Sequence, residues 1–293
     1  MILNFAGRFV LCLGLFLSLS HSVKADTSLK TGRETASTPP SANAPSIQTL
    51  SGTYDIYFGG IRLADLIVVL SLQPDQNIAI SMAMHAQGLA DTVTDFQAEA
   101  VFQGTIGPDI LRTRELNVRW SNKDTPHHAV LTYDAHNIPV SFTSTDPDTR
   151  AVVTPLPAFT DLSAQTISPL MALFQPRARA ACGQTLHLFD GQRLSTLEPV
   201  PASTEEARAD EARAVSEQSS ASSDRSSPIS VPINCRFSWH PISGHTERTI
   251  EFAQNMTPLD ISFTTAGPLR VPLKLLIETR YGYVAMKLRA PFQ

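Results

Sequence analysis

Two small groups of residues have types and spacing that could carry out chemistry. His187 lies three residues before Asp190, and an imidazole near a carboxylate can act as an acid–base pair. Arg112 and Arg114 are two residues apart, so on a strand both would lie on one face, as a clamp for a carboxylate or phosphate requires. A hydrolase that uses these residues is therefore one hypothesis for the function.

Each group also has a structural interpretation. Asp190 is followed by Gly191, and Asp-Gly is a common hairpin turn in which the Asp binds its own backbone and the Gly takes positive φ. The arginine pair lies beside Glu115, which dilutes the positive field, and is typical of a solvated strand face. We favour the structural interpretation of both groups.

The sequence contains no motif of a known catalytic class. It lacks the GxSxG elbow, the HExxH zinc motif and the GxxxxGK[ST] phosphate loop. His127 and His128 are adjacent, so on a strand they point to opposite faces and cannot both bind one metal. His240 and His245 flank Gly244 in an expected surface turn. We therefore predict no catalytic residue, no metal site and no cofactor.

The N-terminus has the pattern of a secretory signal peptide over residues 1–25. Arg8 precedes an apolar run, and Val23-Lys24-Ala25 supplies the small-residue ending, so cleavage is expected after Ala25. The alternative is an uncleaved membrane anchor, but the apolar run is shorter than the roughly 20 residues that a spanning helix needs. We predict a periplasmic protein without stable membrane insertion.

Loss of the signal peptide would leave a mildly acidic chain. Without Arg8 and Lys24, the 23 basic residues become 21 against 27 acidic ones, a net charge of −6. Such a balance offers nothing to attract a polyphosphate, so nucleic acid is excluded as an expected partner.

Export would also leave two cysteines, Cys182 and Cys235, because Cys12 lies in the signal peptide. An oxidising compartment favours a disulfide between them. A metal pair or a redox-active thiol is the rival interpretation, but the sequence has no CxxC. The bridge predicts that strands at 186–188 and 233–237 are neighbours.

The remaining chain divides into a tether and one domain. Residues 26–50 contain Pro39-Pro40 and are predicted to be a flexible linker. Residues 51–293 are predicted to be a single β-rich domain, interrupted by a disordered insert at about 201–230 that has almost no large apolar residue.

Apolar residues alternate with period two through this domain, which predicts strands. The pattern begins at Tyr54–Phe58, turns at Gly59-Gly60 and returns over Ile61–Leu72, with a change of phase at Ala64-Asp65 that indicates a bulge. Further strands are predicted at 78–84, 96–102, 116–120, 130–133, 186–188, 233–239, 250–252, 261–263, 273–279 and 283–288.

One short helix is predicted after Ser168-Pro169, which suit the first positions of a helix, and before Pro176. The fold class is therefore all-β and mainly antiparallel, a barrel-like or strongly curved sheet with one short helix covering an end.

Several segments together resemble an exported bacterial family, domain of unknown function 3108. They are residues 54–61, 85–96, 168–173, 189–193 and 272–288. The resemblance implies a periplasmic, barrel-like β-sheet domain with no established reaction. The chain departs from the family pattern at Ser168 and Met171, where the family has an acid and a hydroxyl, and at Asp65, where glycine is common.

We therefore expect a non-enzymatic periplasmic protein that binds an apolar ligand or lipid, or another envelope component. The alternatives are an envelope hydrolase and a module that binds a protein partner along a sheet edge. The sequence names neither the ligand-binding residues nor the oligomeric state.

Overall fold

The computed structural model describes residues 47–122, 125–145, 166–179, 182–201, 232–279 and 282–293. The expected signal peptide lies outside the described residues, as does the expected insert except for Pro201. Of the expected linker, only the end is described, and there strand β1 already begins at Gln48.

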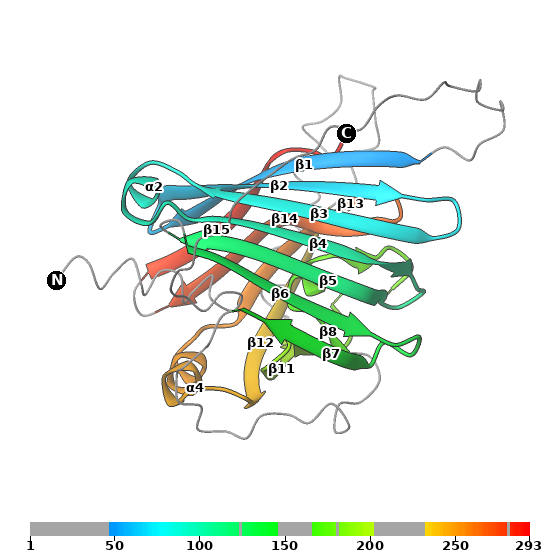
Figure 1. The fold of residues 1–293 in the computed structure, drawn as a ribbon. Coiled ribbons are helices and arrows are strands. Elements are labelled where there is room, and N and C mark those ends of the chain that lie inside the picture. Colours follow the sequence, from blue (N-terminus) through cyan, green and yellow to red (C-terminus); the bar gives the residue numbers. More distant parts are fainter. Residues whose placement is uncertain (1–46, 123–124, 146–165, 180–181, 202–231, 280–281) are drawn as a thin grey trace, which may run out of the picture.

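The first half of the described chain is a meander of long antiparallel strands (Figure 1). Each strand pairs with the next in the chain, and successive pairs are joined by short turns or, between β3 and β4, by helix α2 (Leu89–Thr94). The strands are β1 (Gln48–Phe58), β2 (Ile61–Leu72), β3 (Asn77–Ala86), β4 (Gln97–Ile106), β5 (Leu111–Asn122), β6 (Thr125–Tyr133) and β7 (Pro139–Ser144).

The second half completes the same sheet from the other side of β1. The sheet order is β7-β6-β5-β4-β3-β2-β1-β15-β14-β13-β12-β11-β10-β8, with the short β9 paired to β14. Among the strand pairs of the described residues, only β8–β10 is parallel. These strands are β8 (Thr166–Ile167), β9 (Gln175–Pro176), β10 (Leu186–Phe189), β11 (Leu194–Pro199), β12 (Ile233–Ser243), β13 (Leu259–Ala266), β14 (Leu269–Thr279) and β15 (Gly282–Ala290).

The sheet curls into a nearly closed barrel, which confirms the predicted fold class (Figure 1). Asn137, in the β6–β7 turn, links the two ends of the sheet order. Its Oδ1 accepts a hydrogen bond from the Thr113 N–H of β5 at 2.6 Å, and its Nδ2 donates to the Thr166 carbonyl of β8 at 2.8 Å. Asn137 is 2% exposed with φ of 64°, a conformation that Asn tolerates better than most residues.

The β1–β2 hairpin follows its sequence pattern. Tyr54 and Ile56 are buried, and Gly59 and Gly60 take φ of 55° and 89° in the turn. Leu63 is the extra residue of a bulge, because Ile56 pairs with Ala64 while Tyr57 pairs with Arg62. The bulge therefore lies one residue before the predicted Ala64-Asp65 position.

One helix prediction and one strand prediction need correction. The segment after Ser168 forms only one turn of 3₁₀ helix, η2 (Met171–Leu173), and lies inside the barrel. Residues 250–252 are not a strand but part of helix α4 (Glu247–Gln254), which is capped by the Thr246 hydroxyl accepting from the Thr249 N–H. No helix in the described ranges combines the length and hydropathy needed to cross a bilayer.

Cys182 and Cys235 form a disulfide with a Cα–Cα distance of 5.2 Å. The prediction that the strands at 186–188 (β10) and 233–237 (β12) are neighbours is wrong, because β11 lies between them and pairs with both. Cys182 reaches Cys235 from the loop before β10, so the bridge ties a loop to a strand.

Candidate functional site

The size of inward-facing side chains changes along the barrel. Three successive cross-strand rows, fixed by the register of β2 to β6, show the change. The packed row is Leu70, Ile80, Phe102 and Leu116; the cavity row is Val68, Met82, Ala100 and Val118; the end row is Leu66, Met84, Ala98, Trp120 and His127.

The interior is filled at the packed row and hollow at the cavity row. Leu70, Ile80 and Phe102 are fully buried and lie among other buried apolar residues, including Phe189 and Leu269. A cavity of about 200 Å³ lies beside the cavity row, with Leu116 of the packed row at its border, and the inward-facing lining residues of β4 are Ala98 and Ala100. Small side chains in the middle of the wall therefore create the space.

The cavity separates two apolar clusters. One cluster lies mainly on β1–β6 and the other mainly on β10–β15, and Leu173 and Leu275 pack against both. The 3₁₀ turn and its two flanking residues cross the interior between the two walls. They contribute Leu170, Leu173 and Phe174 to the lining of the cavity. Ser168 holds the start of this segment, because its Oγ accepts a hydrogen bond from the Leu170 N–H at 3.3 Å.

The lining is mostly apolar, and two of its buried aromatic residues, Tyr54 and Trp239, carry polar groups. Tyr54 is 0% exposed, and burial raises the pKa of its hydroxyl, which therefore stays neutral. Neither the Tyr54 hydroxyl nor the Trp239 indole N–H has a hydrogen-bond partner among the described residues. Such groups cost free energy unless something bonds to them, so they are available to a polar atom of a ligand.

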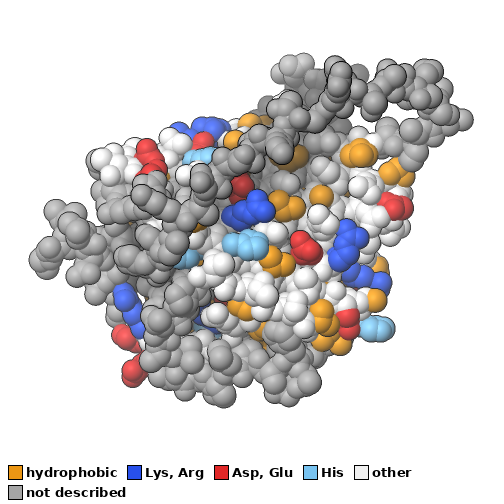
Figure 2. All heavy atoms as spheres, in the orientation of Figure 1, with side chains coloured by type: hydrophobic (Ala, Val, Ile, Leu, Met, Phe, Trp, Pro, Cys, Tyr) orange, Lys and Arg blue, Asp and Glu red, His pale blue; other side chains and the backbone are white. Residues whose placement is uncertain are grey.

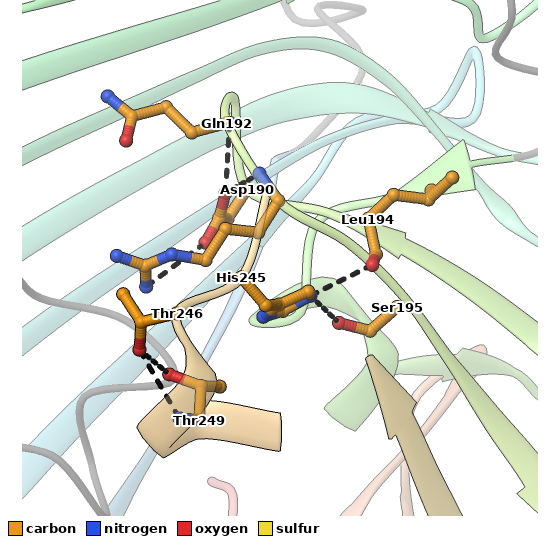
Figure 3. A network of polar contacts seen from close by, with 8 residues as sticks. Asp190, Gln192, Leu194, Ser195, His245, Thr246 and Thr249 are labelled. Atoms are coloured by element: carbon orange, nitrogen blue, oxygen red, sulfur yellow. Dashed lines mark hydrogen bonds and ion pairs between the residues drawn. The ribbon is translucent and has the colours of Figure 1, made fainter. Parts of the chain in front are cut away.

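A network of polar contacts lies beside the cavity, around the β10–β11 turn (Figure 3). Asp190 also lines the cavity, but its Oδ1 accepts from the N–H groups of Gln192 at 3.0 Å and Arg193 at 2.7 Å. Gly191 has φ of 104°. The carboxylate therefore stabilises its own turn, as the Asp-Gly pattern predicts.

His245 lies on the other side of this network. The prediction that it belongs to a surface turn is wrong, because its side chain is buried. It is 2% exposed, and its Nε2 lies 2.9 Å from the Leu194 carbonyl and 3.1 Å from the Ser195 hydroxyl (Figure 3). Gly244, with φ of 74°, passes so close to the Gln192 carbonyl that a side chain there would collide with it. This tight turn places His245 inside, and nothing in the local sequence signals it.

Ser195, His245 and Asp190 are residue types found in hydrolases, but their geometry differs from a catalytic arrangement. A carbonyl only accepts hydrogen bonds, so the contact with Leu194 places a hydrogen on Nε2 of His245. That nitrogen therefore cannot accept the Ser195 proton. Burial lowers the pKa of His245, and the other contributions to its pKa are smaller. The neutral imidazole thus acts here as a hydrogen-bond donor within the fold.

The other candidate residues are dispersed. His187 is exposed on the face of β10 opposite the cavity-lining Leu188. Arg112 and Arg114 are both exposed, and Arg114 donates to the Gln103 side chain at 2.9 Å. The described residues include no group of three His, Cys, Asp or Glu side chains placed to hold a metal ion.

The two histidine pairs are also separated. His127 is buried and His128 half-buried on adjacent positions of β6, as alternation predicts. His240 is exposed on β12, and its Nε2 lies 3.7 Å from a Glu198 carboxylate oxygen, whereas His245 lies in the interior.

Comparison with known proteins adds no assignment. No family model, no curated protein and no solved structure matches this chain.

Proposed function

We propose that this protein is a non-enzymatic binding protein of the periplasm that holds an apolar ligand, or the apolar part of an envelope component, inside its barrel. The observation that carries the proposal is the cavity of about 200 Å³, which begins where the wall changes from the packed row to the cavity row. A barrel that only needed stability would fill this space, because every missing contact weakens the core.

The chemistry of the lining supports an apolar ligand. Apolar cavities of this order stay dry and accept apolar molecules, because water would find too few hydrogen-bonding partners there. The Tyr54 hydroxyl and the Trp239 N–H are too few to hold a polar ligand but sufficient to orient an apolar one that carries a single polar group.

Binding is preferred over hydrolysis for a specific reason. The groups beside the cavity that resemble catalytic residues are committed to the fold, Asp190 to its turn and His245 to the Leu194 carbonyl. The molecular face in Figure 2 shows basic, acidic and histidine side chains interspersed with single apolar ones among its described residues. This mixture of charges among the described residues does not favour a polyanionic partner.

The compartment is proposed from the N-terminal pattern. The signal-like order of Arg8, the apolar run and Ala25 is typical of export, and the Cys182–Cys235 pair is placed as an oxidising compartment would use it.

Titration with phenylnaphthylamine, a neutral apolar fluorophore, tests the proposal. The wild-type protein should bind it saturably with enhanced fluorescence. Ala100→Leu places a larger side chain in the cavity and should abolish the signal, while Val101→Leu, the exposed neighbour on the outer face of β4, should leave it unchanged. Absence of wild-type binding, or equal binding by Ala100→Leu, would refute an interior site.

A further inference from the structure

The charged residues at the border of the apolar cavity are both acidic. Among the described residues, no lysine, arginine or histidine lines the cavity, whereas Glu99 and Asp190 do. Glu99 is exposed and lies between the inward-facing Ala98 and Ala100 on β4, so alternation places its carboxylate on the outer face of the barrel. The charge on the interior side of this border is therefore that of Asp190.

Asp190 makes the interior unfavourable for a charged ligand group of either sign. Burial raises the pKa of the Tyr133 hydroxyl, and the negative charge of Asp190 raises it further. A carboxylate or phosphate in the cavity would lose its water beside this charge and find no cation among the lining residues. An ammonium would find the carboxylate engaged, because Oδ1 accepts from two N–H groups and Oδ2 lies 3.8 Å from the Arg193 guanidinium.

The lining instead offers hydrogen-bond donors. Trp239 is 5% exposed, and its ring meets the His245 ring edge-on with centroids 5.9 Å apart. An indole N–H only donates, and that of Trp239 has no acceptor within the described ranges. The neutral Tyr54 hydroxyl is unpartnered in the same way and can also donate. A hydrocarbon would leave both donors unpaired, whereas a ligand with an acceptor atom would satisfy one of them.

The third uncharged polar residue of the lining differs from these two. The Ser168 Oγ already accepts from the Leu170 N–H at 3.3 Å. Trp239 and Tyr54 are therefore the residues through which the lining can recognise a polar atom of a ligand.

The volume of the cavity limits the part of the ligand that it encloses. An apolar cavity of roughly 150 Å³ holds one benzene molecule. The cavity of about 200 Å³ is somewhat larger, so it suits a small ring system or a chain of medium length.

We propose that the ligand of the apolar cavity is an uncharged molecule with a hydrogen-bond acceptor, such as a ketone or ester oxygen, to which Trp239 or Tyr54 donates. This inference rests on the proposed function and adds the ligand class. The acceptor fixes the orientation of the ligand, and the apolar side chains of both walls surround the remainder.

Four probes with a nine-carbon chain test the ligand class. They are nonane, 2-nonanone, nonanoate and nonylammonium, and each competes with phenylnaphthylamine at pH 8, where the last two are charged. We expect 2-nonanone to bind about a hundredfold or more tightly than either ion, because an unpaired buried charge is far more costly than a buried carbonyl.

Variants test the hydrogen bond. At least one of Trp239→Phe and Tyr54→Phe should weaken binding of 2-nonanone by about fivefold relative to binding of nonane, the effect of one neutral hydrogen bond. Nonane corrects for the change of cavity shape, because it makes no hydrogen bond. Trp120→Phe is the matched control. Trp120 is also buried with an unpartnered N–H in the described part of the chain, but it does not line this cavity, so its loss should leave both affinities unchanged.

The outcomes separate this inference from the proposed function. Equal losses for 2-nonanone and nonane in both variants, with phenylnaphthylamine still bound by the wild type, would overturn the acceptor and leave the apolar cavity as the binding site. Binding of nonanoate or nonylammonium as tight as that of 2-nonanone would overturn the restriction to uncharged ligands. Failure of the wild type to bind phenylnaphthylamine and all four probes would overturn both proposals.

Discussion

The packed row and the cavity row are neighbours in one continuous wall, yet their side chains pack differently. In the packed row, Ile80 and Phe102 are fully buried against other apolar side chains. One row further, Met82 and Ala100 lie at the same depth in the sheet and border empty space.

The difference shows that a few inward positions decide whether this barrel is solid or hollow. Backbone pairing continues unbroken through both rows, so the sheet itself does not create the cavity. The cavity is created by the change from a large side chain at Phe102 to a small one at Ala100 on β4. Stability should therefore be concentrated at the packed row and binding at the cavity row.

The largest expected effect comes from truncation in the packed row. Phe102→Ala should reduce the free energy of unfolding by about 3–5 kcal/mol, because a fully packed ring is replaced by a void. Met82→Ala should lose only about 2 kcal/mol, since one side of Met82 already lacks contacts. Urea denaturation of both variants measures the difference, and equal losses would contradict the contrast between the rows.

Enlarging a residue should give the opposite contrast. A Cβ at Gly104, at the packed end of β4, would collide with the Arg112 carbonyl and the Phe102 ring, so Gly104→Ala should cost about 1–3 kcal/mol. Ala100→Leu, a larger change on the same strand, should leave the melting temperature unchanged or raise it. A greater loss from Ala100→Leu than from Gly104→Ala would mean that the cavity row has no usable space.

The polar network beside the cavity should make stability depend on pH. Burial lowers the native pKa of His245 below its ordinary value of 6.5, so below pH 6.5 the unfolded chain binds more protons than the native one. The contribution of His245 to the free energy of unfolding is therefore fully present above pH 6.5. It declines in more acidic solution by at most about 1.4 kcal/mol per pH unit until the native imidazole also protonates.

Variants isolate this contribution in denaturation measured at several pH values. His245→Gln should flatten the decline below pH 6.5, whereas His240→Gln, at an exposed position of β12, should retain it. If both variants keep the wild-type slope, His245 is not buried as a neutral donor.

The smallest expected effect is at Tyr54. Its hydroxyl has no hydrogen-bond partner among the described residues, so Tyr54→Phe should change the free energy of unfolding by less than about 1 kcal/mol, and in the stabilising direction. Calorimetry with Tyr57→Phe, a half-buried tyrosine on the other face of β1, provides the comparison. A loss above about 2 kcal/mol at Tyr54 would show that the hydroxyl is bonded in the protein.

Local patterns sufficed for the strands of the first half except β7, which was not predicted. Alternation at Tyr54 and Ile56, the Gly59-Gly60 turn and the bulge near Ala64 all depend on residues close in sequence. The same method failed for α4, because Ile250 and Phe252 also fit a period of two, while the Thr246 cap that begins the helix has only a short polar signal.

Features set by distant residues were beyond the sequence. Strand β11 contains few large apolar residues and was missed, so β10 and β12 were wrongly placed as neighbours. The cavity required the register of three strands to bring Met82, Ala100 and Val118 side by side. His245 is buried by a turn at Gly244 against the β10–β11 connection, a contact between segments about 50 residues apart.

The most direct test of an interior binding site is to identify what the protein carries from its own compartment. Wild-type protein and Ala100→Leu would be purified from the producing cell without detergent, extracted with organic solvent and examined by mass spectrometry. An apolar or amphiphilic compound should appear in near-equal molar amount with the wild type and be absent from Ala100→Leu. Equal recovery from both proteins, or an empty wild-type extract together with no phenylnaphthylamine binding, would contradict the account.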